Sequence, residues 1–372
     1  MKLYCRFYMV IVFGILLLFG VFTVFSPAKN FSENENRYLE QFPEASLHTI
    51  LAGEFQDGFE EAFSDQFPGR DIWMFGTAAV EKIAGFKEQN GVYIGKDGYY
   101  LKKTTQEDID EKQYLQNLRY VEYLGDCQKN KTSMVLVPSP GTILKSSLPE
   151  YAPYYDADAM YQMAETILKR SKLVDSRAEL TEYGKQNQIY YKTDHHWTLL
   201  GAYAAYSAYC DANEFEKHTY GYFAAKKISE DFLGTMYSKV MLPGTGKDTM
   251  YAASNIPQAS VVCDGEAKSG IYDVEKLTQK DKYGYFFGGN YGKTEITVNN
   301  KTNKKLLVIK DSYANSFVPF LMEDYHEITM LDLRYYRDSV QKLLKEDSYD
   351  EILVLYEMSN FAEDRNLYKL VY

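Results

Sequence analysis

The sequence predicts an α/β protein in which helices flank a parallel sheet, preceded by an N-terminal transmembrane helix. Two observations support this fold class. Residues 7–25 form an uncharged apolar run, and in the C-terminal third short apolar runs alternate with helical periodicity, which is typical of a parallel sheet. With 45% hydrophobic and 25% charged residues, the chain has the composition of a folded protein. The net charge of -11 argues against a nucleic-acid partner, because a phosphate-binding surface requires a basic stripe.

The apolar run "FYMVIVFGILLLFGVFTVF" comprises the 19 residues from Phe7 to Phe25. A helix rises about 1.5 Å per residue, so this run is just long enough to cross a hydrocarbon core of about 30 Å. Lys2 and Arg6 precede it and favour a cytoplasmic N-terminus, which puts the following chain outside the cytoplasm. A cleavable signal peptide usually has a shorter apolar region and a small-residue exit. Because this run is long and ends in "SPAKN", we favour a single-pass membrane anchor over residues 1–29 that is not cleaved.

Residues 30–105 are expected to form a lead segment and a hairpin that pack on the core. Phe55, Phe59 and Phe63 recur at helical spacing. The stretch "NGVYIGKDGYYL" has Asn-Gly and Asp-Gly steps between aromatic runs, which is a strong hairpin signal. Three of the four cysteines follow the anchor. This odd number argues against a disulfide framework and leaves room for at most one bridge.

Residues 106–372 are expected to form the main α/β domain, with an insertion of some β-structure around residues 215–300. "TSMVLV" and "KLVDS" are predicted strands on either side of a helix at residues 158–170. After the insertion, "LLVIK", "HEITMLDL" and "YDEILVLYE" are predicted strands, and residues 338–346 are predicted to be helical. Ligands of parallel sheets bind at the carboxyl ends of the strands. Four polar side chains follow such ends here: Ser312, Arg334, Tyr356 and Asn360.

The stretch "LLVIKDSYANSF" carries the first element of a possible reaction centre. A buried strand from Leu306 to Ile309 runs into Asp311 and Ser312, and a helix is predicted to follow. A serine at such a turn presents its hydroxyl at the open end of the sheet, and its N–H near a helix N-terminus can stabilise an oxyanion. Taken alone, however, Asp-Ser at a helix start is more often an N-cap. We therefore predict Ser312 as a nucleophile only if another part of the chain supplies a base.

The stretch "TDHHWT" supplies a base and a carboxylate within three residues. In an extended or turn conformation, side chains at positions i and i+2 point to the same side. Asp194 and His196 should therefore face one another, while His195 points away. A serine hydroxyl becomes nucleophilic when a base oriented by a carboxylate takes its proton, so we predict His196 as base and Asp194 as its partner. Thr193 or Thr198 can cap the helix that follows.

A metal site is the main alternative for the adjacent histidines. His195 and His196 would diverge on a regular element, and the other three histidines, His48, His218 and His326, have no helical i, i+4 partner. A metal centre of this kind requires more ligands than the sequence supplies. We therefore predict no metal and no cofactor.

At this point the sequence resembles a known family. "TDHHWT" matches the motif that names the DHHW proteins, which resemble the SGNH-hydrolase-like O-acetyltransferases of alginate and other exopolysaccharides. Those proteins carry an Asp-x-His-Trp segment ahead of a serine in a strand–turn–helix, an order that is circularly permuted relative to ordinary SGNH esterases. The lead segment and hairpin also look like the family, and the resemblance covers most of residues 33–372, most weakly over 215–300. It implies an SGNH-like, flavodoxin-like sheet.

The resemblance also implies further site residues. By their order along the strands, Arg334 and Asn360 occupy the places of oxyanion or substrate contacts, with Tyr356 nearby. His195 and Trp197, which flank the predicted base, are further candidate substrate or oxyanion contacts. Ordinary SGNH esterases use glycine at the place of Arg334, which leaves the oxyanion assignment open. An equally simple interpretation is that Arg334 is a surface ion-pair partner.

We therefore expect a membrane-anchored, extracytoplasmic O-acetyltransferase that acts on a cell-surface or exopolysaccharide glycan through Ser312, His196 and Asp194. A carbohydrate acetylesterase with the same residues is one alternative, and a non-catalytic glycan-binding or scaffold protein of polysaccharide assembly is another. If the protein transfers acyl groups, the resemblance implies a membrane-bound O-acyltransferase as the acyl donor. Contact with the membrane is expected through residues 7–25.

Overall fold

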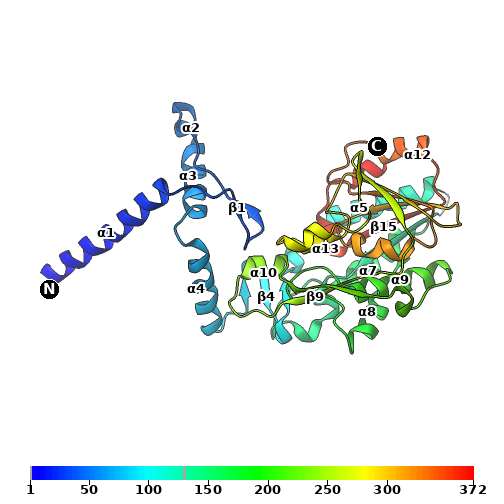
Figure 1. The fold of residues 1–372 in the computed structure, drawn as a ribbon, viewed down its shortest axis with the longest axis horizontal. Coiled ribbons are helices and arrows are strands. Elements are labelled where there is room, and N and C mark those ends of the chain that lie inside the picture. Colours follow the sequence, from blue (N-terminus) through cyan, green and yellow to red (C-terminus); the bar gives the residue numbers. More distant parts are fainter. Residues whose placement is uncertain (1, 129–130) are drawn as a thin grey trace. The chain divides into compact units, whose positions relative to one another are not determined.

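The computed structural model describes residues 2–128 and 131–372 (Figure 1). Met1, the first residue of the predicted anchor, lies outside the described residues. The chain forms two compact units: an N-terminal unit of residues 1–86 with 238–245, and an α/β unit of residues 87–237 with 246–372. The predicted division of the chain after residues 29 and 105 stays a prediction.

The N-terminal unit consists of helices and one short strand pair. Its elements are α1 (Lys2–Phe25), β1 (Phe31–Ser32), β2 (Arg37–Tyr38), α2 (Leu47–Ala52), α3 (Glu54–Asp65) and α4 (Arg70–Ile83). Helix α1 forms where the apolar run predicted it, and its stretch Tyr4–Phe25, with a mean hydropathy of 2.6, is long and apolar enough to cross a membrane. The helical phase predicted for the phenylalanines is found in α3, where Phe55, Phe59 and Phe63 stack on one another.

The α/β unit contains the remaining strands and helices, and α10 runs on into residues of the N-terminal unit. The strands are β3 (Glu88–Gln89), β4 (Val92–Ile94), β5 (Tyr100–Lys102), β6 (Thr132–Val137), β7 (Lys172–Val174), β8 (Lys226–Phe232), β9 (Asp248–Ala252), β10 (Ala259–Cys263), β11 (Glu266–Lys268), β12 (Lys293–Val298), β13 (Lys305–Lys310), β14 (Glu327–Leu331) and β15 (Glu351–Glu357). The α-helices are α5 (Glu111–Cys127), α6 (Pro140–Ile143), α7 (Ala157–Ile167), α8 (Arg177–Gly184), α9 (Leu199–Asn213), α10 (Thr235–Val240), α11 (Ala314–Phe317), α12 (Val340–Glu346) and α13 (Met358–Glu363). Two of the 3-10 helices are η6 (Lys282–Tyr285) and η7 (Val318–Leu321).

The main sheet has the strand order β11-β10-β12-β14-β13-β15-β6-β7. The five strands from β14 to β7 are parallel, which confirms the predicted α/β class with its parallel sheet. The other three strands come from the region predicted as an insertion, and they extend the sheet in antiparallel fashion from β14. The insertion is therefore part of the sheet and not a separate appendage.

Alternate residues of the central strands face two hydrophobic cores. In β13, Leu306 and Val308 belong to one core and Leu307 and Ile309 to the other. This alternation explains the continuous apolar runs of the sequence, because both faces of a parallel sheet are covered. Helix α9 and the insertion cover the first face, whereas α5, α7, α12 and α13 cover the second. Figure 1 shows these helices around the sheet.

The chain turns sharply after β13, where Ser312 lies. The carboxylate of Asp311 accepts three hydrogen bonds here, from the backbone N–H groups of Tyr313 and Glu357 and from the side chain of Asn360. These bonds tie the end of β13 to the end of β15. The helix that follows is shorter than predicted: α11 has four residues and continues as the 3-10 helix η7, because Pro319 cannot donate to the helical ladder. The predicted helix dipole behind Ser312 is accordingly weak.

Candidate active site

The loop from Ile189 to Thr198 holds the predicted base. Its two arms pair as a narrow hairpin, in which the N–H of Tyr191 donates to the carbonyl of His196 (3.1 Å) and the N–H of Thr198 to the carbonyl of Ile189 (2.9 Å). Thr198 then caps α9 by accepting the N–H of Gly201, as one of the two predicted caps. The arms fix the backbone, so the residues at the tip have defined directions.

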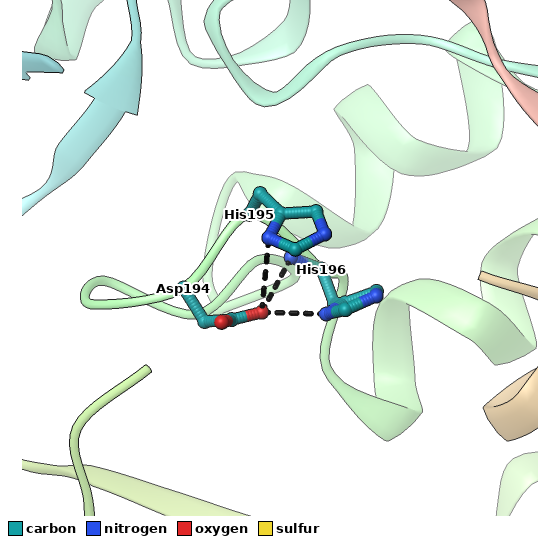
Figure 2. Close-up of side chains that lie close together, drawn as sticks. All are labelled: Asp194, His195 and His196. Carbon is teal, nitrogen blue, oxygen red and sulfur yellow. Dashed lines mark hydrogen bonds and ion pairs between the residues drawn. The ribbon is translucent and has the colours of Figure 1, made fainter. Parts of the chain in front are cut away.

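Asp194 is a buried carboxylate whose two oxygens accept four hydrogen bonds. Oδ1 accepts from the backbone N–H of His196 (3.0 Å) and from His196 Nδ1 (2.6 Å). Oδ2 accepts from the backbone N–H (2.8 Å) and the hydroxyl (2.9 Å) of Thr235 at the start of α10. Figure 2 shows how the carboxylate points at both the ring and the backbone of His196. Asp194 and His196 thus face one another, as their spacing predicted.

The imidazole of His196 links Asp194 to the predicted nucleophile. Its Nε2 lies 2.7 Å from the hydroxyl oxygen of Ser312, although the two residues are 116 positions apart in the chain. The ring of His196 is buried, whereas Ser312 is half-buried. Asp194, His196 and Ser312 therefore form one continuous chain of hydrogen bonds at the carboxyl end of β13.

The contacts of Asp194 determine the tautomer of this imidazole. An ionised carboxylate only accepts hydrogen bonds, so the ring nitrogen that faces it must carry the proton. In a neutral imidazole the other nitrogen, Nε2, is then an acceptor. The Ser312 hydroxyl donates to it, which is the arrangement that a proton transfer from serine to histidine requires.

Electrostatics keep Asp194 ionised. Burial by itself raises the pKa of this carboxyl, but the neighbouring imidazoles of His195 and His196 and the donors from Thr235 outweigh burial and hold its pKa well below the usual value. A carboxylate that is satisfied by so many donors remains charged at any physiological pH. It can therefore stabilise the positive charge that His196 acquires when it takes a proton.

Aromatic rings enclose His196. The ring of Tyr283, from η6, stacks on the imidazole with a centroid distance of 3.7 Å and an interplanar angle of 7°. Its hydroxyl donates to the carbonyl of Ser312 (3.2 Å) and lies 3.1 Å from the Ser316 hydroxyl. Tyr313 packs against another side of the imidazole. The stacking fixes the plane of the ring and excludes water from its face.

Trp197 does not take part in the way that was predicted. Its side chain is fully buried, and its indole N–H donates to the hydroxyl of Ser316 (2.9 Å) and the carbonyl of Tyr313 (3.2 Å). The prediction that Trp197 contacts substrate is therefore wrong, because no part of the ring can be reached. Trp197 instead packs under the turn that carries Ser312.

The other predicted contacts gather around one pocket. Arg334, Tyr356 and Asn360 line a cavity of about 350 Å³, and Asp311, which precedes Ser312, forms part of its wall. Arg334 is held by Asp332 through two hydrogen bonds of 2.9 and 2.6 Å, so the ion pair is present, while the residue also lines the cavity. The Tyr356 ring is buried, with its hydroxyl on Asp364.

The predicted direction of His195 is only partly correct. The ring is partly exposed, but its Nδ1 lies 3.7 Å from Oδ1 of Asp194 and 2.7 Å from the hydroxyl of Thr235, so His195 does not point away from Asp194. Ligand atoms of Asp194, His195 and His196 nevertheless lie within 4.8 Å of one another, close enough in principle for a cation (Figure 2). A cation there would displace the hydrogen bonds of Asp194 with Thr235 and His196. The contacts that are present favour the hydrogen-bonded arrangement.

Four contributors to this site were not predicted, and all come from the region read as an insertion. Tyr283 covers His196 and Thr235 binds Asp194. Gly234 lies so close to Asp194 that a Cβ atom would meet the Oδ2 of the carboxylate at 2.3 Å. Asp248 accepts the backbone N–H groups of Lys192 (3.0 Å) and Thr193 (2.8 Å) and so holds the loop. The local sequence carries no signal for these contacts beyond the glycine before Thr235, because they depend on tertiary packing.

The fold and this geometry define an α/β protein with a Ser–His–Asp chain of hydrogen bonds at the carboxyl edge of its parallel sheet. Residues 161–331, which include all three residues, match the family described as DHHW protein. The resemblance found in the sequence is thereby confirmed. The chain is also 24% identical over 212 residues to the probable alginate O-acetylase AlgJ of Pseudomonas syringae pv. tomato. That match covers 53% of this chain, which spans about half the length, 49%, of the curated relative.

Two solved structures share the fold. A DHHW family protein from Eubacterium siraeum matches with a TM-score of 0.65 and 24% identity, covering 76% of this chain and 95% of that one. Bacillus cereus PatB1, with a sulfonyl adduct, matches with a TM-score of 0.60 and 21% identity, covering 74% and 96%. At these identities the structures establish the fold, whereas function has to be argued from the site.

Proposed function

We propose that the protein is a membrane-anchored, extracytoplasmic O-acetyltransferase that acts on a surface polysaccharide, with Ser312 as nucleophile, His196 as base and Asp194 as its orienting carboxylate. The observation that carries the proposal is the pair of short contacts from His196, 2.7 Å to Ser312 and 2.6 Å to Asp194. The similarity to an alginate O-acetylase supports the choice of an acetyl group and a polysaccharide.

The first half of the reaction would acylate Ser312. As Ser312 Oγ attacks the carbonyl carbon of the donor ester, its proton passes to His196 Nε2, and the resulting imidazolium is stabilised by Asp194. Collapse of the tetrahedral intermediate expels the donor alcohol, which receives the proton from His196. The second half repeats these steps with a sugar hydroxyl as the nucleophile, and it returns Ser312 to its free form.

The proposed donors for the developing oxyanion are the N–H of Ser312 and the amide of Asn360. The N–H of Ser312 makes no hydrogen bond within residues 2–128 and 131–372, whereas the N–H of Tyr313 is bound to Asp311. The amide of Asn360 donates to Asp311 at 2.9 Å and carries a second N–H. We assign the Ser312 N–H and Asn360 as the oxyanion donors, with Arg334 at the pocket wall as a contact for the substrate.

The proposed membrane attachment rests on α1. The helix is apolar and largely exposed over Tyr4–Phe25, and Arg6 precedes its apolar core and favours a cytoplasmic N-terminus. No acetyl-coenzyme A pool exists outside the cytoplasm, so the acyl group would have to come from a membrane partner. A membrane-bound O-acyltransferase fits that role.

The proposal is tested with the full chain in detergent micelles and p-nitrophenyl acetate as acyl donor. We expect release of p-nitrophenolate that Ser312→Ala abolishes and that Ser260→Ala, an exposed serine on β10 of the same sheet, leaves unchanged. A fluorosulfonyl probe should label Ser312 and no other serine, because it reacts with activated hydroxyls. Turnover at background level that is equal in wild type and Ser312→Ala would refute the proposal and favour a non-catalytic glycan-binding protein.

Transfer and hydrolysis are separated by the acceptor. Both use the same acyl-enzyme and differ only in whether water or a sugar hydroxyl attacks it. With an oligosaccharide added, a transferase yields acetylated sugar in a mass spectrum while total p-nitrophenolate release rises. Acetate alone, with no acetylated sugar at any acceptor concentration, would instead identify an esterase.

A further inference from the structure

The last turns of α1 pack against the segment that joins α3 to α4. Phe19 of α1 stacks on Phe67 with a centroid distance of 5.5 Å and contacts Trp73 edge-on at 6.4 Å. Phe67 and Trp73 also contact each other. All three residues belong to the N-terminal unit, so these contacts fix the position of α4 relative to the apolar helix.

The position of Phe19 along α1 sets a depth for these contacts. Phe19 lies six residues before the end of the helix at Phe25, which is about 9 Å at the rise of an α-helix. If the apolar stretch spans the hydrocarbon core, Phe67 and Trp73 lie inside the core, at a depth short of the point where α1 leaves it. Tryptophan is enriched at this interface because its ring is apolar and its N–H can remain hydrated.

Helix α4 continues with an apolar face on its exposed side. Ile72, Trp73, Val80 and Ile83 are exposed by 76, 57, 65 and 87%. At about 100° per residue these four side chains fall within an arc of about 100°. Exposed apolar side chains that share one face of a helix mark an interaction surface.

The charges of α4 lie away from this arc. At its N-terminus, Arg70 pairs with Glu35, and Asp71 accepts a hydrogen bond of 2.9 Å from Asn34. Charged groups that are already paired lower the cost of moving a helix into a region of low water content. In Figure 1, α3 and α4 follow one another along a line that runs at an angle to α1.

We propose that α4 is an interfacial helix whose face of Ile72, Trp73, Val80 and Ile83 lies in the outer leaflet of the bilayer that α1 crosses. This inference rests on the proposed insertion of α1 and adds a second membrane contact, beyond the predicted span of residues 7–25. We assign lipid and not protein as the partner of this face, because the face is continuous with α1, the helix that enters the bilayer. Such helices typically bind at a depth of about 5–10 Å. The contact of Phe19 with Trp73 lies about 9 Å from the end of α1, which agrees with that depth.

Tryptophan fluorescence tests the proposal in the full chain. The protein has two tryptophans, of which Trp73 is exposed and Trp197 is fully buried in the α/β unit. In proteoliposomes with lipids brominated along their acyl chains, we expect loss of the emission that Trp73 contributes, measured as the difference between wild type and Trp73→Phe. Trp73→Phe itself should show no quenching.

A matched pair of variants moves the probe along the helix. In the Trp73→Phe background, Ile83→Trp puts a tryptophan on the proposed face, and Lys82→Trp puts one at the adjacent, exposed position outside the arc. Bromolipids should quench the first and spare the second. Equal quenching of the two would overturn the proposal, because lipid would then not distinguish the face from the rest of the helix. No quenching at Trp73 or Ile83→Trp would also overturn it, and would mean that a second copy or another part of the protein covers the face. Failure of wild type to float with vesicles would refute the insertion of α1 instead, which is a different result.

Discussion

Gly234→Ala should disable the site by displacing Asp194. A Cβ atom at position 234 would lie 2.3 Å from both Cβ and Oδ2 of Asp194 and 2.6 Å from its Cγ. Because Cβ of Asp194 is part of the clash, rotation of the carboxylate cannot relieve it. The backbone of Gly234 is not among the residues with positive φ, so the expected effect comes from the clash and not from conformational strain.

The size of the effect follows from the contacts that are lost. Ordinary contact begins at 3.4 Å, so Asp194 and the new side chain must separate by about 1 Å, a displacement that can cost about 10²-fold in rate at a reacting centre. The separation also stretches the hydrogen bonds from Thr235 to Asp194, now 2.8 and 2.9 Å. Hydrogen bonds to a charged group contribute about 1.5–3 kcal/mol to stability, so we also expect a lower melting temperature.

The assay is p-nitrophenyl acetate turnover and thermal unfolding of the full chain, with Gly246→Ala as the control. A Cβ atom at position 246 would have no heavy atom within 4 Å, and Gly246 has no positive φ, so its substitution should leave both quantities unchanged. We expect Gly234→Ala to lose about 10- to 100-fold in turnover at a temperature where it is still folded. A folded Gly234→Ala variant with wild-type turnover would show that the position of Asp194 does not limit the reaction.

Three further changes have defined outcomes. Asp194→Asn removes the charge that orients His196, so turnover should fall on the order of 10⁴-fold while the circular dichroism spectrum stays close to that of wild type. A loss of turnover below tenfold would contradict the role of Asp194. Tyr283→Leu removes the ring stacked on the imidazolium and should lower turnover about 2- to 30-fold. Tyr283→Phe keeps the ring and should keep most of the turnover. Equal losses of turnover in the two variants would assign the effect to the hydroxyl. Burial lowers the pKa of Lys310 from 10.5 to about 8, so between these values the unfolded chain binds more protons than the folded one and stability rises with pH. Urea unfolding from pH 8 to 10.5 should show a gain of at most about 3 kcal/mol in wild type that is absent in Lys310→Met, and parallel pH profiles would refute the assignment.

Some features of the protein are determined by short stretches of sequence. The apolar run before residue 26 predicts α1, because a long run without charge is compatible with a helix that crosses a membrane. Uninterrupted apolar runs such as "LLVI" predict buried parallel strands because both faces of β13 are covered. The approach of Asp194 to His196 is local as well, since two residues separated by one position on a tight loop have few other arrangements.

Only the tertiary structure decided what surrounds that pair. Ser312 reaches His196 because β13 ends where the loop before α9 arrives, over a separation of 116 residues. The stacking of Tyr283 has no signal in the sequence, and a glycine at position 234 does not by itself indicate which residue approaches it, because a stacked ring and a close contact have no periodicity of their own. For Trp197 the sequence predicted a contact that the structure does not have. Its neighbours in the motif suggested that it contacts substrate, but its ring packs against Tyr313 and is buried. Sequence patterns report which residues are buried along one element, whereas a reaction centre depends on where loops from different elements meet, and that is set by how the whole core packs.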